Sequence, residues 1–187
     1  MHTSRSHVAS ALIAVSVTTA ALIGCTPTPA PSPPTTTGAT HIPPTPSPSP
    51  TRPAAADRTD IEGAIAAAQH FLELYPYAYN TGDLTTWKAM SHPECIFCKS
   101  VIENVEELHA AGGYEVGGAF EFETVAALEP VPGNEFYSVD FEVAQVPGQR
   151  FDGSGALLST FGGQRSVALL AVQPTTDGWR IREVTVE

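Results

Sequence analysis

Residues 61–83 read IEGAIAAAQHFLELYPYAYNTGD, and this stretch predicts the long helix around which the fold is built. Its apolar residues recur every three or four positions, which is the spacing of one face of an α-helix. They are Ile61, Ala64, Ile65, Ala68, Leu72, Tyr75 and Tyr79. Asp57 or Asp60 can cap the start, and Gly82 can end the helix in a left-handed conformation. Because Pro76 has no amide hydrogen to donate, we expect a kink or a break near Tyr75.

Two shorter helices follow along the chain. Residues 83–90 predict the first, with the side chain of Asp83 as its cap. Residues 93–111 predict the second, because Pro93 suits the first helical position, where an amide hydrogen has no partner within the helix. The glycines from Gly112 to Gly118 then form a joint between helix and strands.

The next part of the chain has the alternation of antiparallel strands. Apolar and polar side chains alternate in residues 120–128 and again in residues 136–146. Pro132-Gly133-Asn134 supplies a turn between these two strands. The alternation places Leu128 on the same apolar face as Phe122.

Two more strands complete the predicted sheet. Residues 166–173 are continuously apolar, and residues 179–186 follow a polar turn. Residues 147–163 contain five glycines and predict a loop with a short strand near residues 156–161. Helices followed by antiparallel strands indicate an α+β fold, in which N-terminal helices pack on a curved antiparallel sheet.

The N-terminus has the features of an export signal. Arg5 is the only charged residue before a short apolar stretch that ends at Gly24. The end of this stretch, Leu22-Ile23-Gly24-Cys25, resembles the bacterial lipobox, whose cysteine is lipidated and becomes the mature N-terminus. We therefore expect residues 1–24 to be a lipoprotein signal peptide and Cys25 to anchor the protein in the membrane. The alternative is a plain secretory signal that happens to precede a cysteine.

Residues 25–56 predict a disordered linker. Eleven of the 17 prolines lie between Pro27 and Pro53, mixed with Thr and Ser. Such sequence favours extended polyproline II conformations and has almost nothing with which to form a core. A ligand for a proline-binding module and a glycosylated stalk are alternatives. The folded domain is then residues 57–187.

The folded domain is strongly acidic. The chain has 20 acidic and nine basic side chains, for a formal net charge of −11, and no acidic residue precedes Asp57. Such a surface repels phosphate backbones, so we exclude nucleic acid as a partner. The expected contact with a membrane is through the lipid on Cys25, with the domain on the extracytoplasmic side.

Cys95 and Cys98 form the sharpest motif of the domain. Cysteines three positions apart at a helix start have Cα atoms about 5 Å apart, within disulfide range. A structural disulfide is the expected state outside the cytoplasm. A reactive dithiol is one alternative, and a metal site that adds His92 and Glu94 is another. Structural zinc normally needs a second ligand pair, which is missing, so we expect no metal or other cofactor.

Aromatic side chains on the predicted apolar faces either fill the space between helices and sheet or line a pocket there. Glu183 is the only strand carboxylate that the alternation places on an inner face, which makes it the candidate acid or base. No catalytic dyad is visible. The candidate pocket residues are Tyr75, Tyr79, Trp87, Phe122, Tyr137, Phe141, Trp179 and Glu183.

Two short motifs resemble the nuclear-transport-factor-like (cystatin-like) superfamily. They are Tyr79-Asn80-Thr81-Gly82-Asp83 and Asp177-Gly178-Trp179-Arg180-Ile181. The layout of lipobox, Thr/Pro tether, long helix and Cys-x-x-Cys also resembles a family of uncharacterised actinobacterial lipoproteins. These resemblances imply a cone-like domain in the cell envelope that can form a homodimer through its sheet face. They imply no established activity.

The sequence therefore predicts a membrane-anchored envelope lipoprotein whose domain binds a small apolar ligand or another envelope protein. The alternative is an enzyme. Its pocket would use Glu183 in isomerase- or hydrolase-like chemistry, or its Cys95 and Cys98 would act as a redox dithiol.

Overall fold

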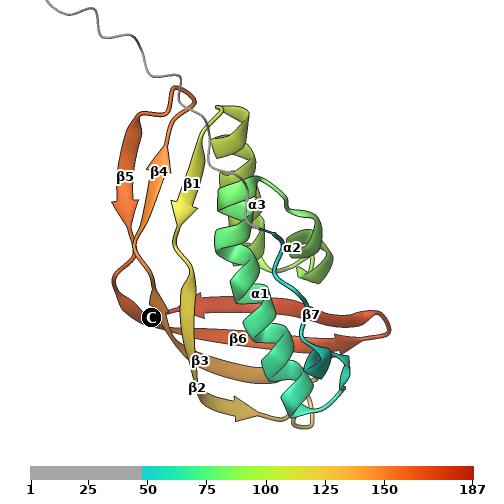
Figure 1. The fold of residues 1–187 in the computed structure, drawn as a ribbon. Helices are drawn as coiled ribbons and strands as arrows, with labels where there is room; N and C mark the ends of the chain where they lie inside the picture. Colours follow the sequence, from blue (N-terminus) through green and yellow to red (C-terminus); the bar gives the residue numbers. More distant parts are fainter. Residues whose placement is uncertain (1–47) are drawn as a thin grey trace, which may run out of the picture. The chain divides into compact units, whose positions relative to one another are not determined.

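The fold is seen in a computed structural model that describes residues 48–187 (Figure 1). The predicted signal peptide, Cys25 and most of the predicted linker lie outside the described residues. A short 3-10 helix, Ala54–Asp57, precedes the first α-helix. The carbonyl of Ala56 accepts hydrogen bonds from Trp179 Nε1 at 3.0 Å and from Arg52 at 2.5 Å. Packed structure thus begins before residue 57, because the buried Trp179 indole N–H takes its partner there.

α1 (Ile61–Thr81) is the predicted long helix. The carboxylate of Asp60 caps it by accepting a hydrogen bond from the Gly63 amide at 3.2 Å, and Gly82 ends it with φ of 76°. The expected break near Tyr75 is wrong, because α1 continues through Pro76. Packing along the helix compensates for the one missing hydrogen bond.

α2 (Thr85–Met90) and α3 (Ile96–Ala110) are the other two helices. The predicted cap is one residue off, because α2 begins at Thr85 and its N-cap is Leu84, while the Asp83 carboxylate accepts a hydrogen bond from the Thr85 amide at 3.0 Å. α3 begins three residues later than predicted, because Pro93 lies in the turn that precedes it.

Seven strands form two antiparallel sheets, one in the order β2-β3-β6-β7 and one in the order β1-β4-β5 (Figure 1). Their bounds are β1 Tyr114–Gly117, β2 Phe120–Leu128, β3 Tyr137–Gln145, β4 Gly148–Phe151, β5 Leu157–Phe161, β6 Arg165–Thr175 and β7 Gly178–Val186. The four-stranded sheet consists of the predicted strands. β1 and β4 are corrections to the prediction, since they occupy glycine-rich segments that were expected to be a joint and a loop.

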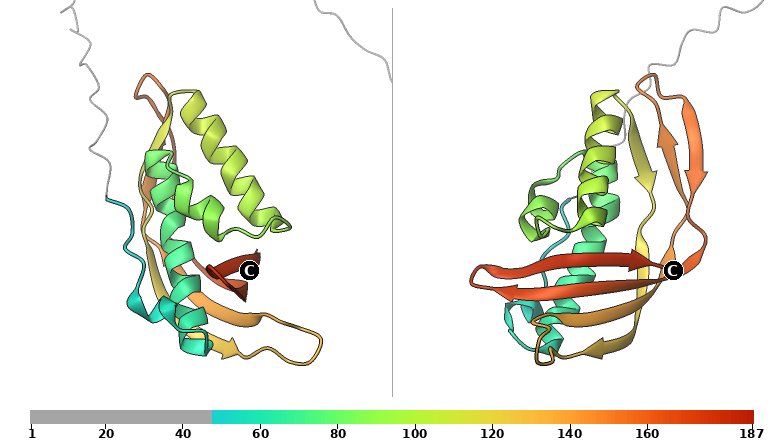
Figure 2. Two further views of the ribbon diagram at one scale, coloured as in Figure 1. Left: turned by 90° about the vertical axis from the view of Figure 1, so that its right-hand side faces the viewer. Right: turned by 180° about the vertical axis from the view of Figure 1, so that it is seen from behind.

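The two sheets are continuous with each other, because three strands of one sheet lead directly into strands of the other. β1 leads into β2, β3 into β4, and β5 into β6, so the strands continue from one sheet into the other in matching order. Figure 2 shows the three-stranded sheet turned sharply away from the four-stranded one. Glycines at two of the bends have φ between 76° and 83°, a region that other residues avoid: Gly117, Gly118, Gly162 and Gly163. The predicted curvature is therefore produced at bends, and the described strands form no closed barrel.

The main core lies between the helices and the four-stranded sheet. Its largest side chains are at most 1% exposed: Trp87, Phe71, Phe141, Leu74, Leu170 and Ile181. One predicted inner position is wrong, because a bulge between Thr124 and Ala126 reverses the faces of β2 beyond it. Leu128 consequently points outward and is 64% exposed.

Candidate functional site

A groove of about 470 Å³ lies at the bend between the two sheets, beside α1 and the start of α3. This volume is within the range of small-molecule sites, about 300–1,000 Å³. The lining residues come from α1, α3 and five strands with their bends: Leu72, Tyr75, Phe97, Phe120, Val143, Gln145, Thr160, Phe161, Gly162, Gln164, Ser166, Ala168, Val184 and Val186.

The floor of the groove is apolar, and its more exposed edge combines polar side chains with Val186. The most buried lining side chains are aliphatic and 2–8% exposed: Leu72, Val143, Ala168 and Val184. The polar lining side chains are half-buried or exposed: Gln145, Thr160, Gln164 and Ser166. This gradient matches a molecule with an apolar part directed inward and a polar part directed toward solvent.

Tyr75 is the one predicted pocket residue that lines this groove. Burial raises the pKa of its hydroxyl, and the neighbouring Tyr79 adds to the effect, so Tyr75 stays a neutral phenol. Four other predicted residues fill the core and are at most 6% exposed: Tyr79, Trp87, Phe141 and Trp179. Phe122 and Tyr137 are half-buried and pack their rings against that core.

Glu183 is a correction to the prediction, because its side chain is exposed. β6 and β7 change register between Ala171 and Val172, so that Arg182 is an extra residue in β7. The faces of β7 reverse beyond this bulge, and Val184 takes the buried position. Glu183 therefore does not line the groove, and no other carboxylate among the lining residues can act as the predicted acid or base.

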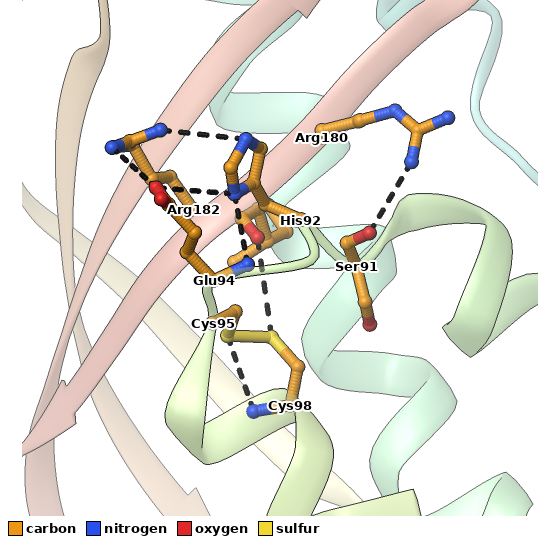
Figure 3. A network of polar contacts seen from close by, with 8 residues as sticks. Ser91, His92, Glu94, Cys95, Cys98, Arg180 and Arg182 are labelled. Carbon is orange, nitrogen blue, oxygen red and sulfur yellow. Dashed lines mark hydrogen bonds and ion pairs between the residues drawn. A yellow bond between two sulfur atoms is a disulfide. The ribbon is translucent and has the colours of Figure 1, made fainter.

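Cys95 and Cys98 form a disulfide at the start of α3 (Figure 3), with their Cα atoms 5.2 Å apart. Both are at most 1% exposed. The Cys98 carbonyl accepts a hydrogen bond from Trp87 Nε1 at 3.1 Å, which ties the disulfide-bonded turn to the core. A disulfide buried in this way gives a partner thiol no access, so the structure favours the structural role over the reactive dithiol.

His92 and Glu94 lie beside this disulfide and are held by Arg182 (Figure 3). Arg182 donates a hydrogen bond to the Glu94 carboxylate at 2.8 Å and lies 3.4 Å from His92 Nε2. The Glu94 amide donates to the other ring nitrogen, Nδ1, at 3.1 Å. His92, Glu94 and Arg182 thus contact one another. Within residues 48–187, no three potential metal ligands come together.

A second ionic site, which the sequence analysis missed, joins β1 to β4. Glu115 is 5% exposed and accepts a hydrogen bond from Arg150 Nε at 2.8 Å. The two residues are direct partners in the sheet, and Arg150 also lies over the ring of Tyr79, 5.6 Å from its centroid. Burial raises the pKa of Glu115, and the bonds to Arg150 oppose this shift. The ion pair therefore joins β1 to β4, and Arg150 also connects this sheet to α1 through its contact with Tyr79.

Cys25 and its predicted lipid lie outside the described residues. Of the helices that the structure describes, none combines the length and the hydropathy needed to cross a bilayer.

No curated protein matches the chain. Among solved structures, the intermembrane space region of the chloroplast protein ARC6 is similar at a TM-score of 0.54 and 12% identity, over 69% of this chain and 97% of that chain. This likeness shows a shared fold alone. A structure from Catenulispora acidiphila has a TM-score of 0.43 and 15% identity, over 65% of this chain and 88% of the other. The nuclear-transport-factor-like and actinobacterial lipoprotein resemblances stay predictions.

The family model of DUF6318, a family of unknown function, matches residues 36–185. The chain therefore belongs to this family.

Proposed function

We propose that the protein is a lipid-anchored component of a bacterial cell envelope whose extracytoplasmic domain binds a small apolar ligand in the groove. The sequence Leu22-Ile23-Gly24-Cys25 supports the anchor. The buried disulfide of Cys95 and Cys98 supports an oxidising compartment.

The groove is the single observation that carries the binding function. Its aliphatic floor and half-buried rings can remove an apolar molecule from water. Each methylene group buried in this way contributes about 0.8 kcal/mol to binding. Glycines fix the backbone at the bends beside the groove, so the shape of the groove is set by the fold.

The chemistry of the lining favours binding over catalysis. Tyr75 is the only titratable side chain among the residues that line the groove, and it is held as a neutral phenol. A general acid–base reaction needs a group whose pKa lies near the working pH. The groove therefore suits ligand binding better than isomerase- or hydrolase-like chemistry.

The anchor is tested by growing an exporting bacterial host with an alkynyl palmitate. We expect the wild-type chain to be labelled and to sediment with membranes. The Cys25→Ser chain should lose the label and leave the membrane fraction. A chain with Cys95→Ser and Cys98→Ser is the matched control and should keep the label. Label that persists in the Cys25→Ser chain would contradict the anchor.

The groove is tested with N-phenyl-1-naphthylamine, an uncharged probe that fluoresces in apolar sites. The full chain carrying Cys25→Ser, here called the unlipidated chain, is recovered without detergent and titrated with the probe. Thr160→Trp should place an indole in the groove and reduce binding at least about tenfold, since it occupies the space that the probe needs. Ser159→Trp, at a neighbouring exposed position that is not among the lining residues, is the control and should bind as the unlipidated chain does. Equal binding by both variants would refute the groove as the site.

A protein partner or a homodimer through the sheet face is the competing proposal. The outer face of β3 carries Asp140 and Glu142, and Glu142 forms an ion pair with Arg165, so a dimer through this face would have to accommodate these charges. Light scattering of the unlipidated chain separates the two ideas. A monomer that binds the probe supports the ligand site, and a dimer without probe binding supports the interface.

A further inference from the structure

The groove has no charge anywhere in its lining, although it belongs to a strongly acidic protein. Its lining residues are aliphatic, aromatic, hydroxyl-bearing or amide-bearing, with one glycine. The chain around them has a formal net charge of −11, so its field opposes the approach of an anion. An anionic head at the rim would find no cation among the lining side chains to offset this repulsion.

The arginines closest to the groove along the chain are already paired with acids. Arg165 lies between the lining residues Gln164 and Ser166, and it forms an ion pair with Glu142. Arg182 precedes the lining strand segment of β7 by two residues, and it forms an ion pair with Glu94. An anionic headgroup would have to compete with a carboxylate for either cation.

The rim offers groups that suit an uncharged polar head. Gln164 and Gln145 carry amides, and Thr160 and Ser166 carry hydroxyls, all at the half-buried or exposed edge of the groove. Amides and hydroxyls both donate and accept hydrogen bonds, so they match hydroxyl, amide and ester groups. The aliphatic floor beneath them matches a hydrocarbon chain.

We infer that the natural ligand is an uncharged amphiphile, in which one hydrocarbon chain ends in a hydroxyl, amide or ester head. The chain lies on the floor formed by Leu72, Val143 and Ala168, and the head lies at Gln164 and Thr160. This inference rests on the proposed function, because it names the chemical class of ligand for the same groove.

The test is a competition between two probes that share a chain and differ in charge. Decyl alcohol and decanoate are each used to displace N-phenyl-1-naphthylamine from the unlipidated chain at neutral pH. We expect decyl alcohol to displace the probe at a concentration about tenfold lower, since the acidic chain repels decanoate and the lining offers its carboxylate no cation. Equal potency, or a preference for decanoate, would overturn the inference and leave the groove as a binding site. No binding of the fluorescent probe would instead overturn the proposed function.

A charge placed on the rim makes the test independent of any general effect of solubility. Gln164→Lys supplies a cation at the proposed head position, so it should increase the affinity for decanoate about tenfold relative to the affinity for decyl alcohol. Ser159→Lys, at a neighbouring position that is not among the lining residues, should change neither affinity. Equal gains in both variants would show that decanoate responds to net charge, and the assignment of the head position would fall.

Discussion

Phe71 and Tyr75 lie one turn apart on the same stripe of α1, yet one fills a core and the other lines a groove. Phe71 is fully buried and stacks on Trp87 with ring centroids 4.0 Å apart. The ring of Tyr75 is 5.7 Å from Phe120 and 6.3 Å from Phe97, and all three border open space. The groove also borders small residues at the bend, including Gly162 and Ala168. α1 contributes a large aromatic side chain to each region. The groove is present where small residues, such as Gly162 and Ala168, lie across from the helix.

The largest expected effect of a single change is in the filled region. Trp87→Ala should lower the free energy of unfolding by about 3–5 kcal/mol, because it removes a buried ring and the hydrogen bond to Cys98. Phe97→Ala, in the groove, should cost only about 2 kcal/mol, since that ring is half-buried. Urea unfolding followed by circular dichroism measures both. Equal losses of unfolding free energy in the two variants would contradict the claim that one region is filled and the other is open.

The ion pair between β1 and β4 should have the next largest effect, because Glu115 is buried and Arg150 also packs over Tyr79 of α1. Glu115→Ala leaves Arg150 without its partner and should cost about 2 kcal/mol. That value is at the low end for buried pairs because the Arg150 side chain is 40% exposed. Probe binding should weaken in the same variant. A loss near zero would mean that the three-stranded sheet is held by other contacts.

The same carboxylate predicts a pH dependence with a defined sign. Burial raises the pKa of Glu115 above its ordinary value of 4.5 in the folded state. Its contribution to stability is therefore fully present below pH 4.5 and is lost as the pH rises through the folded pKa. Glu115→Gln should remove this loss, so the wild type should lose more stability than the variant between about pH 4 and pH 7. Parallel curves of unfolding free energy against pH would contradict the assigned shift.

The disulfide closes a short loop and should contribute less than the core beneath it. Replacing Cys95 and Cys98 by alanine should cost about 2 kcal/mol, on the loop-entropy estimate. Because the two cysteines lie beside Trp87 and not in the groove lining, affinity for the probe should change less than about twofold. Loss of probe binding without loss of stability would contradict a purely structural role for the disulfide of Cys95 and Cys98.

The smallest expected effect is at the cap of α1. The bond from Arg58 lowers the pKa of Asp60 from 3.8 to about 2. The resulting stabilisation is present above pH 3.8 and disappears as the pH falls toward 2. Asp60→Asn keeps an acceptor for the Gly63 amide but not the charge, so its stability should depend less on pH in this range. Melting temperatures measured across acidic pH check this prediction.

Local signals in the sequence are sufficient for the ends of α1 and for the main strands. Asp60 has the acceptor that an N-cap requires, Gly82 readily adopts the positive φ of a C-cap, and the alternation in β3 places Val139 and Phe141 in the core as expected. β1 and β4 were missed for a physical reason. Glycines at the strand ends, such as Gly117 in β1 and Gly148 in β4, make a short strand resemble a loop.

The site was harder to predict because it depends on residues far apart in the chain. A single bulge reversed the face of Glu183, and alternation alone cannot reveal a bulge. The aromatic positions were correctly assigned to the interior side of the strands and helices. Whether each ring fills or lines space depends on the size of the residue across from it, which is known only once the strand register is known.

Native mass spectrometry of the unlipidated chain, recovered from its own host, tests the central claim most directly. The account predicts an additional noncovalent mass in that chain and in Ser159→Trp, and its loss in Thr160→Trp. The released molecule should be an uncharged amphiphile. A protein without any bound mass, or the same bound mass in all three chains, would contradict the claim that the groove at the bend is the ligand site.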